Sequence, residues 1–192
     1  MTDPRYTKLA KVLVEYSTAL KKGDRVLIEV FDLPDEFAVE LMRLARKKGA
    51  IPLIEVRHTR VTREIMRETN PKHAALVKTV ELHRMKKMQA YIGIRGAANA
   101  SENSDVPGER LSLYMKTLRP VLDWRVQKTR WVVLRWPTPS MAQSAAMSTE
   151  AFEDFYFRVC TMDYRKMGRA MAPLVKRLRR ADRVQQIGRA HV

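Results

Sequence analysis

The chain has 192 residues, of which 45% are hydrophobic, so it is long enough to bury the core of one domain. Its 37 Lys and Arg residues outnumber its 21 Asp and Glu residues, which gives a formal net charge of +16. No apolar run approaches the roughly 20 residues of a membrane span, and the single cysteine, Cys160, excludes an internal disulfide framework. We therefore expect a cytoplasmic protein with no membrane partner.

The first third of the chain predicts a helix followed by a strand–helix–strand unit. Apolar residues recur at helical spacing over residues 6–20, and Gly23 is expected to end that helix in a left-handed conformation. Residues 25–30 (RVLIEV) and 51–56 (IPLIEV) are apolar runs typical of strands, and residues 35–48 between them predict a helix. In this order the two strands should be parallel neighbours.

The middle of the chain continues this alternation. A short helix, a longer helix, a third strand, a further helix and a fourth strand are predicted at residues 62–68, 71–88, 91–94, 107–125 and 128–136. The polar loop at residues 95–104 follows the carboxyl end of a strand, where α/β sheets usually bind ligands, although a plain surface turn is the simpler interpretation. The pattern predicts an α/β fold with a mostly parallel sheet of about four to five strands and helices on both faces.

Residues 131–160 are the stretch around which we expect the chain to be organised. Residues 131–136 (WVVLRW) predict a buried strand, and the prolines that follow end it because they have no N–H for a ladder. Ser140, Ser148 and Thr161 can cap the three helices that follow. The second of these helices has an apolar stripe composed of Phe152, Phe155, Tyr156 and Val159.

The residue patterns alone assemble no catalytic or metal centre. The histidines lack the His-Glu-x-x-His spacing of zinc peptidases and are scattered at His58, His73 and His83. The adjacent carboxylates of Glu153 and Asp154 diverge on a helix, which makes them a poor bidentate site.

Two dense blocks of sequence nevertheless resemble a known family. The first block is residues 135–143 (RWPTPSMAQ), and the second comprises Met147, Ser148 and residues 152–157 (FEDFYF). In this order and spacing they resemble the aminopeptidase T and aminopeptidase S family of metal-dependent exopeptidases. The resemblance covers residues 4–186.

This resemblance implies that residues 1–186 are the N-terminal α/β domain of such an aminopeptidase, and that a C-terminal metal-binding domain is missing. The family's C-terminal domain supplies glutamate, histidine and aspartate ligands to two divalent metal ions of the zinc, cobalt or magnesium class. The complete enzyme is expected to be a homodimer that releases N-terminal amino acids from a peptide substrate, and this chain alone is expected to be inactive.

The same resemblance points to the corner formed by the prolines that follow residues 131–136 as part of the substrate cleft. We expect no catalytic residue and no metal ligand within the chain. Arg135, Thr138 and Gln143 are expected to line the substrate cleft, because they sit at the end of a strand beside a rigid corner. A merely structural corner is the alternative interpretation.

The last six residues, 187–192 (IGRAHV), resemble the translation of a widely used sequencing-adapter read, ATC-GGA-AGA-GCA-CAC-GTC. We expect them to be an artefact of assembly, and they are excluded from the interpretation of the fold.

The excess of positive charge leaves a second hypothesis open, a basic α/β module that binds nucleic acid or another polyanion. Much of this charge belongs to ordinary polar helix faces. The densest cluster comprises Arg165, Lys166, Arg169, Lys176, Arg177, Arg179, Arg180 and Arg183. We expect a peptide rather than nucleic acid as the partner, because a solvated or interdomain surface accounts for such a cluster.

Overall fold

The computed structural model describes residues 3–185 and 187–188, and the chain divides into two compact units between Cys160 and Thr161. The helical segments of the first unit are α1 (Pro4–Lys11), the π-helical η1 (Val12–Ser17), α2 (Asp35–Lys47), α3 (Thr59–Arg67), α4 (Pro71–Lys86), α5 (Gly108–Lys128), α6 (Pro139–Ser144) and α7 (Thr149–Cys160). Its strands are β1 (Arg25–Phe31), β2 (Ile51–Arg57), β3 (Ala90–Arg95) and β4 (Arg130–Arg135). The second unit contains α8 (Tyr164–Leu178). The expectation about residues 187–192 falls mainly outside the described residues.

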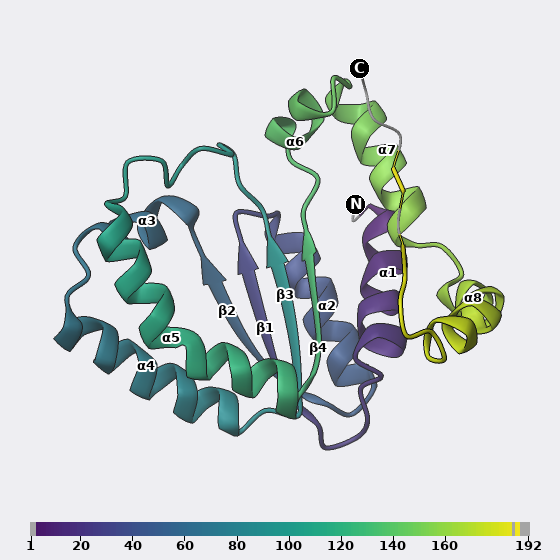
Figure 1. Ribbon diagram of the computed structural model, residues 1–192, viewed down its shortest axis with the longest axis horizontal. Coiled ribbons are helices and arrows are strands. Elements are labelled where there is room, and N and C mark those ends of the chain that lie inside the picture. The colour runs from purple at the N-terminus through teal and green to yellow at the C-terminus, as the bar shows by residue number, and fades with distance from the viewer. Residues whose placement is uncertain (1–2, 186, 189–192) are drawn as a thin grey trace. The chain divides into compact units, whose positions relative to one another are not determined.

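The strands of the first unit form one four-stranded sheet in the order β2-β1-β3-β4, with every pair parallel (Figure 1). The chain passes from β1 to β2 on one side and then returns through α3 and α4 to β3 on the other side. The strand order therefore reverses between β1 and β3. In open α/β sheets, ligands usually bind outside the carboxyl ends of the strands at such a switch point. The α/β fold and the parallel sheet predicted from sequence are confirmed.

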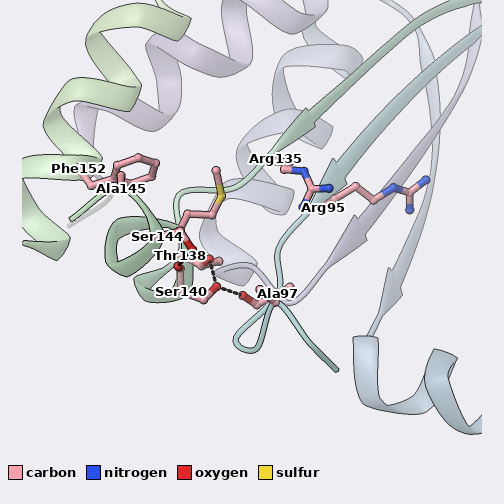
Figure 2. A pocket seen from close by; sticks show the side chains of 10 residues that line it. Arg95, Ala97, Arg135, Thr138, Ser140, Ser144, Ala145 and Phe152 are labelled. Atoms are coloured by element: carbon pink, nitrogen blue, oxygen red, sulfur yellow. Dashed lines mark hydrogen bonds between the residues drawn. The ribbon is translucent and has the colours of Figure 1, made fainter. Parts of the chain in front are cut away.

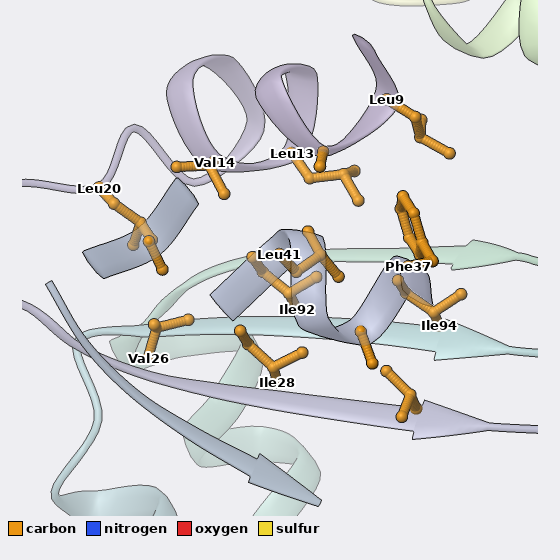
Figure 3. Packing of buried hydrophobic residues seen from close by; sticks show 14 of the residues in the cluster. Leu9, Leu13, Val14, Leu20, Val26, Ile28, Phe37, Leu41, Ile92 and Ile94 are labelled. Atoms are coloured by element: carbon orange, nitrogen blue, oxygen red, sulfur yellow. The ribbon is translucent and has the colours of Figure 1, made fainter. Parts of the chain in front are cut away.

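The larger hydrophobic core lies between the sheet and α1, η1 and α2 (Figure 3). Successive side chains of a strand point to opposite faces, so alternate residues of β1 and β3 reach this core. These residues are Val26, Ile28, Val30, Ala90, Ile92 and Ile94. They pack against Leu9, Leu13, Phe37 and Leu41, each of which is at most 3% exposed.

The opposite face of the sheet is covered by α4 and α5. Leu27 and Tyr91 point to this face and are fully buried with Met85 of α4 and Val121 of α5. Helices therefore lie on both faces, as predicted. No helix among the described residues combines the length and the apolar character that a membrane crossing requires.

The N-terminal helix differs from the single helix predicted over residues 6–20, because α1 gives way to the wider turn of η1. Thr18 is fully buried, and its N–H and its hydroxyl both donate to the carbonyl oxygen of Leu13, at 3.0 and 2.8 Å. The π-helical turn thus provides a partner for a buried hydroxyl. Ala19 (φ 43°) takes the left-handed conformation after the helix, whereas Gly23 (φ 85°) lies in the following turn.

The strand expected to be buried at residues 131–136 is instead the edge strand β4. Trp131 is 44% exposed and Val133 is 43% exposed, whereas the intervening residues pack against the larger core. A short apolar run does not distinguish a central strand from an edge strand, because pairing and covering helices decide the difference. Trp136, just beyond the strand, is only 6% exposed.

The caps and buried faces of the last helices follow the predictions in part. The Ser148 hydroxyl accepts a backbone N–H in the first turn of α7 at 3.3 Å, as predicted. The predicted stripe of α7 was right in part: Phe152 is buried, but Phe155 is 46% exposed and Phe157 is buried instead, because α7 packs against α1. The predicted cap Thr161 was wrong, since the N-cap of α8 is Asp163, whose carboxylate accepts a first-turn N–H at 2.9 Å.

Candidate functional site

The last residues of the strands form a row across the carboxyl edge of the sheet. The parallel register aligns Arg57 with Phe31, Phe31 with Arg95, and Arg95 with Arg135. Residues aligned in this way point to the same face of a sheet. The Arg95 guanidinium lies 4.3 Å from the centre of the Phe31 ring, and the Arg57 guanidinium lies 6.0 Å from it. This edge therefore carries cations on both sides of one aromatic ring.

A buried carboxylate lies one row further into the sheet. Glu29 of β1 is 5% exposed, accepts a hydrogen bond from the Tyr91 hydroxyl, and pairs with Arg95 at 2.8 Å and Arg57 at 3.4 Å. Burial opposes ionisation of Glu29, but the charge of Arg95, the Tyr91 hydrogen bond and the charge of Arg57 outweigh it, so its pKa lies below the ordinary value. The carboxylate is thus ionised at neutral pH and neutralises part of the positive charge of Arg95 and Arg57.

This network depends on a glycine in β3. A Cβ at Gly93 would lie 2.7 Å from the hydroxyl oxygen of Tyr91, so the absence of a side chain lets the tyrosine reach Glu29. Burial and the charge of Glu29 raise the pKa of Tyr91, which keeps its hydroxyl protonated as a donor. The Arg125 guanidinium of α5 lies 3.8 Å from the centre of the same ring. The sequence carried one signal for this network, the charged Glu29 inside an otherwise apolar strand.

The loops that follow β1, β2 and β3 are joined at the same edge. Asp32 has a φ of 45°, and its carboxylate accepts the Thr59 N–H at 2.9 Å and the Thr59 hydroxyl. The same carboxylate lies 3.1 Å from Nδ1 of His58. Burial alone would raise the pKa of Asp32, but the contacts with Thr59 and His58 outweigh it. The pKa of Asp32 is therefore below its ordinary value. In the third loop, the Gly96 N–H donates to the carbonyl oxygen of Phe31 at 2.8 Å.

Gly96 is a position at which we expect no side chain to be tolerated. A Cβ there would lie 2.4 Å from the carbonyl oxygen of Asp32 and 2.6 Å from that of Phe31, both of which are backbone atoms. Gly96→Ala should therefore lower the free energy of unfolding in urea by about 2 kcal/mol. Gly108→Ala is the control, because nothing lies within 4 Å of its added Cβ, and it should change stability by less than about 0.5 kcal/mol. Equal losses in the two variants would contradict the prediction.

A cavity of about 420 Å³ lies beside the carboxyl ends of β3 and β4 (Figure 2). Arg95 and Arg135 form its charged wall, and Thr138 and Ser140 contribute hydroxyl groups. The Ser140 Oγ lies 2.9 Å from the Thr138 Oγ1 and donates to the carbonyl oxygen of Ala97 at 2.8 Å. The remaining lining is mostly small or apolar side chains. The cavity therefore combines two guanidinium groups with a wall of small or apolar side chains that suits an uncharged part of a ligand.

The residues predicted to line a substrate cleft are only partly brought together. Arg135 and Thr138 lie in the cavity wall, whereas Gln143 is exposed on α6 and is not among the described residues that line it. The cap residue of α6 is Thr138 and not Ser140 as predicted, because the Ser140 hydroxyl is bonded to the loop after β3. The sequence indicated the loop at residues 95–104, which begins with Arg95, as a possible ligand site, but the position of Arg95 beside Arg135 was missed because it follows from strand register. The substrate role of the three predicted residues stays a prediction.

The donor groups of the described residues do not fit a metal centre. These residues contain no group of three or more His, Cys, Asp or Glu side chains that could hold a metal ion. Asp32 and His58 supply two such donors, and a protein metal site usually needs three or four. The described residues therefore do not by themselves present the donor set of a paired divalent-metal site.

Comparison with known proteins adds a family and a fold. A family model described as thermophilic metalloprotease (M29) matches residues 2–181. No curated protein matches the sequence. Among solved structures, wild-type AmpT from Thermus thermophilus has a TM-score of 0.63 and 15% sequence identity, over 82% of this chain and 42% of the AmpT chain. The crystal structure of VinN aligns at a TM-score of 0.33 and 11% identity, over 78% of this chain and 26% of that chain.

Proposed function

This chain belongs to the thermophilic metalloprotease family M29, and from that premise we propose that it is the N-terminal α/β domain of a metal-dependent aminopeptidase. The match of the family model over residues 2–181 is the observation that carries the proposal. The complete enzyme would release N-terminal amino acids from peptides in the cytoplasm, as a homodimer. Its cofactors would be two divalent ions of the zinc, cobalt or magnesium class.

The metal ligands, in this proposal, come from polypeptide outside these 192 residues. Two observations support this division of the enzyme. The described residues lack a set of donors for a metal ion, and the chain spans 42% of the length of AmpT. The carboxyl edge of the sheet would then form one wall of the cleft and hold the peptide in position, a contribution that acts through orientation rather than through chemistry.

The proposal is tested with two proteins, this chain and the chain extended by the codons that follow residue 186 in the source gene. The extended enzyme should hydrolyse leucine p-nitroanilide in the presence of zinc, cobalt or magnesium ions, and a chelator should abolish the activity. The 192-residue chain should show no hydrolysis above background and should purify with far less than one metal ion per chain by elemental analysis. Stoichiometric, tightly held zinc or cobalt in this chain, or an inactive extended enzyme, would contradict the proposal.

A further inference from the structure

Two arginines that line the cavity occupy directly aligned positions on neighbouring strands. Arg95 of β3 and Arg135 of β4 are aligned in the parallel register, and Figure 2 shows the Arg135 side chain extending toward that of Arg95. Like charges on directly neighbouring strand positions are unfavourable unless a counter-charge lies nearby. Glu29 supplies that counter-charge to Arg95 at 2.8 Å. For Arg135, no ion pair or side-chain hydrogen bond is recorded within the described part of the chain.

The cavity beside these groups has the electrostatic character of an anion site. No Asp or Glu of the described residues lines it, and the Thr138 and Ser140 hydroxyls at its edge are neutral. Its volume of about 420 Å³ falls within the range of pockets that bind small molecules. An anion in this position would gain a charge-assisted hydrogen bond from Arg135, and it would reduce the repulsion between the two arginines.

The shape of the donors favours a carboxylate over a phosphate. Phosphate sites usually present several free backbone N–H groups at the start of a helix. Here the helix beside the cavity, α6, begins with Pro139, which has no N–H, and the Gly96 N–H is already bonded to the carbonyl oxygen of Phe31. What remains is the flat fork of a guanidinium, which binds carboxylate and phosphate alike, so it is the lack of free backbone N–H groups that favours a carboxylate.

We propose that Arg135, aligned with Arg95, binds a carboxylate of the peptide substrate, either its C-terminal carboxylate or an acidic side chain. This inference rests on the proposed function, because it takes a peptide as the ligand. The small and apolar part of the wall would receive the adjoining residues of the peptide. The site would then favour short peptides, whose carboxyl end lies within reach of the cleft.

The inference is tested on the purified 192-residue chain by NMR, with the arginine Nε–Hε signals followed during titration. Trialanine, which has a free carboxylate, should shift the Arg135 signal and bind at least about tenfold more tightly than trialanine amide, the scale of one charge-assisted hydrogen bond. A third probe, Ala-Asp-Ala amide, distinguishes the two sources of the carboxylate. Affinity like that of trialanine assigns the site to side-chain carboxylates as well, and affinity like that of the amide assigns it to the C-terminus.

Variants separate this contact from the general charge of the protein. Arg135→Gln should remove the preference for trialanine, and Arg135→Lys should restore part of it, because lysine keeps the charge but not the fork. The matched control is Arg46→Gln, at an exposed arginine of α2. It removes the same net charge and should keep the tenfold preference. Circular dichroism establishes that each variant is folded.

Several results would overturn the inference. Equal affinity of the wild-type chain for trialanine and its amide is one, and equal loss of the preference in Arg46→Gln is another. A short single-stranded oligonucleotide that displaces trialanine and requires Arg135 would show a polyanion site instead. The inference and the proposed function can fail independently. An extended enzyme that cleaves trialanine and its amide equally well would retain the function without this site. Preferential binding of trialanine beside an inactive extended enzyme would retain the site without the function.

Discussion

Trp136→Ala should lower the free energy of unfolding by about 3–5 kcal/mol, as expected for removal of a buried aromatic side chain. Trp136 is 6% exposed, and its ring centroid lies 5.4 Å from that of Tyr6, 4.8 Å from that of Phe37 and 5.8 Å from that of Phe157. These partners come from α1, α2 and α7, so one ring joins three helices to the end of β4. A loss of this size is a large share of the roughly 5–15 kcal/mol that stabilises a typical domain.

The matched control for this variant is a tryptophan in β4, the strand that Trp136 directly follows. Trp131 is 44% exposed on the edge of the sheet, so Trp131→Ala should cost less than about 1 kcal/mol. Urea denaturation followed by far-UV circular dichroism measures both variants without depending on tryptophan fluorescence. If the two variants lost equal stability, the aromatic cluster would not hold the corner that carries Arg135. Because Trp136 follows Arg135 directly, its loss should also weaken the trialanine preference.

Glu29→Gln should lower the free energy of unfolding by about 3 kcal/mol, near the lower end of the range for breaking a buried ion pair. The substitution keeps the shape of the side chain but removes the negative charge that pairs with Arg95 and Arg57. We expect less than the full range because these two arginine side chains are 31% and 20% exposed. Arg57 also keeps its ion pairs with Glu55 and Glu81, each at 2.7 Å.

The effect of Glu29→Gln should depend on pH in a defined direction. The pKa of Glu29 is lower in the folded protein than its ordinary value, chiefly because the Arg95 and Arg57 charges and the Tyr91 hydrogen bond outweigh burial. Its stabilising contribution is therefore complete above the unfolded pKa of about 4.3 and is lost as the pH falls through the folded pKa. Urea midpoints at a series of pH values should show a constant gap between wild type and variant near neutrality. That gap should close in acid.

An exposed carboxylate serves as the control for this second prediction. Glu64 lies on α3 and pairs with Arg67 at 3.3 Å, with a side chain that is 59% exposed. Glu64→Gln should change stability by less than about 0.5 kcal/mol, because surface ion pairs contribute little. A Glu29 variant that behaved like Glu64→Gln at every pH would show that the network around Tyr91 does not stabilise the fold.

The amino-acid sequence was enough to specify the helices, the strands and the fold class. Apolar runs and helical spacing located every strand and most helices, because both patterns follow from which side chains must leave water. The strand–helix–strand order required β1 and β2 to be parallel neighbours, as the structure confirms. The block at residues 135–143 carried the family resemblance, and the M29 match over residues 2–181 bears it out.

Which side chains meet at the carboxyl edge of the sheet depends on the folded arrangement of the strands. Arg95 and Arg135 are far apart in the sequence and become neighbours because β3 and β4 pair in one register. A shift of one residue would turn either side chain to the opposite face. The edge position of β4 could not be predicted from the sequence either. Trp131 and Trp136 lie in one apolar run, and yet Trp131 is exposed and Trp136 is buried. Local patterns record the tendency of each segment to fold, whereas burial and charge pairing depend on which distant segments come to lie against it.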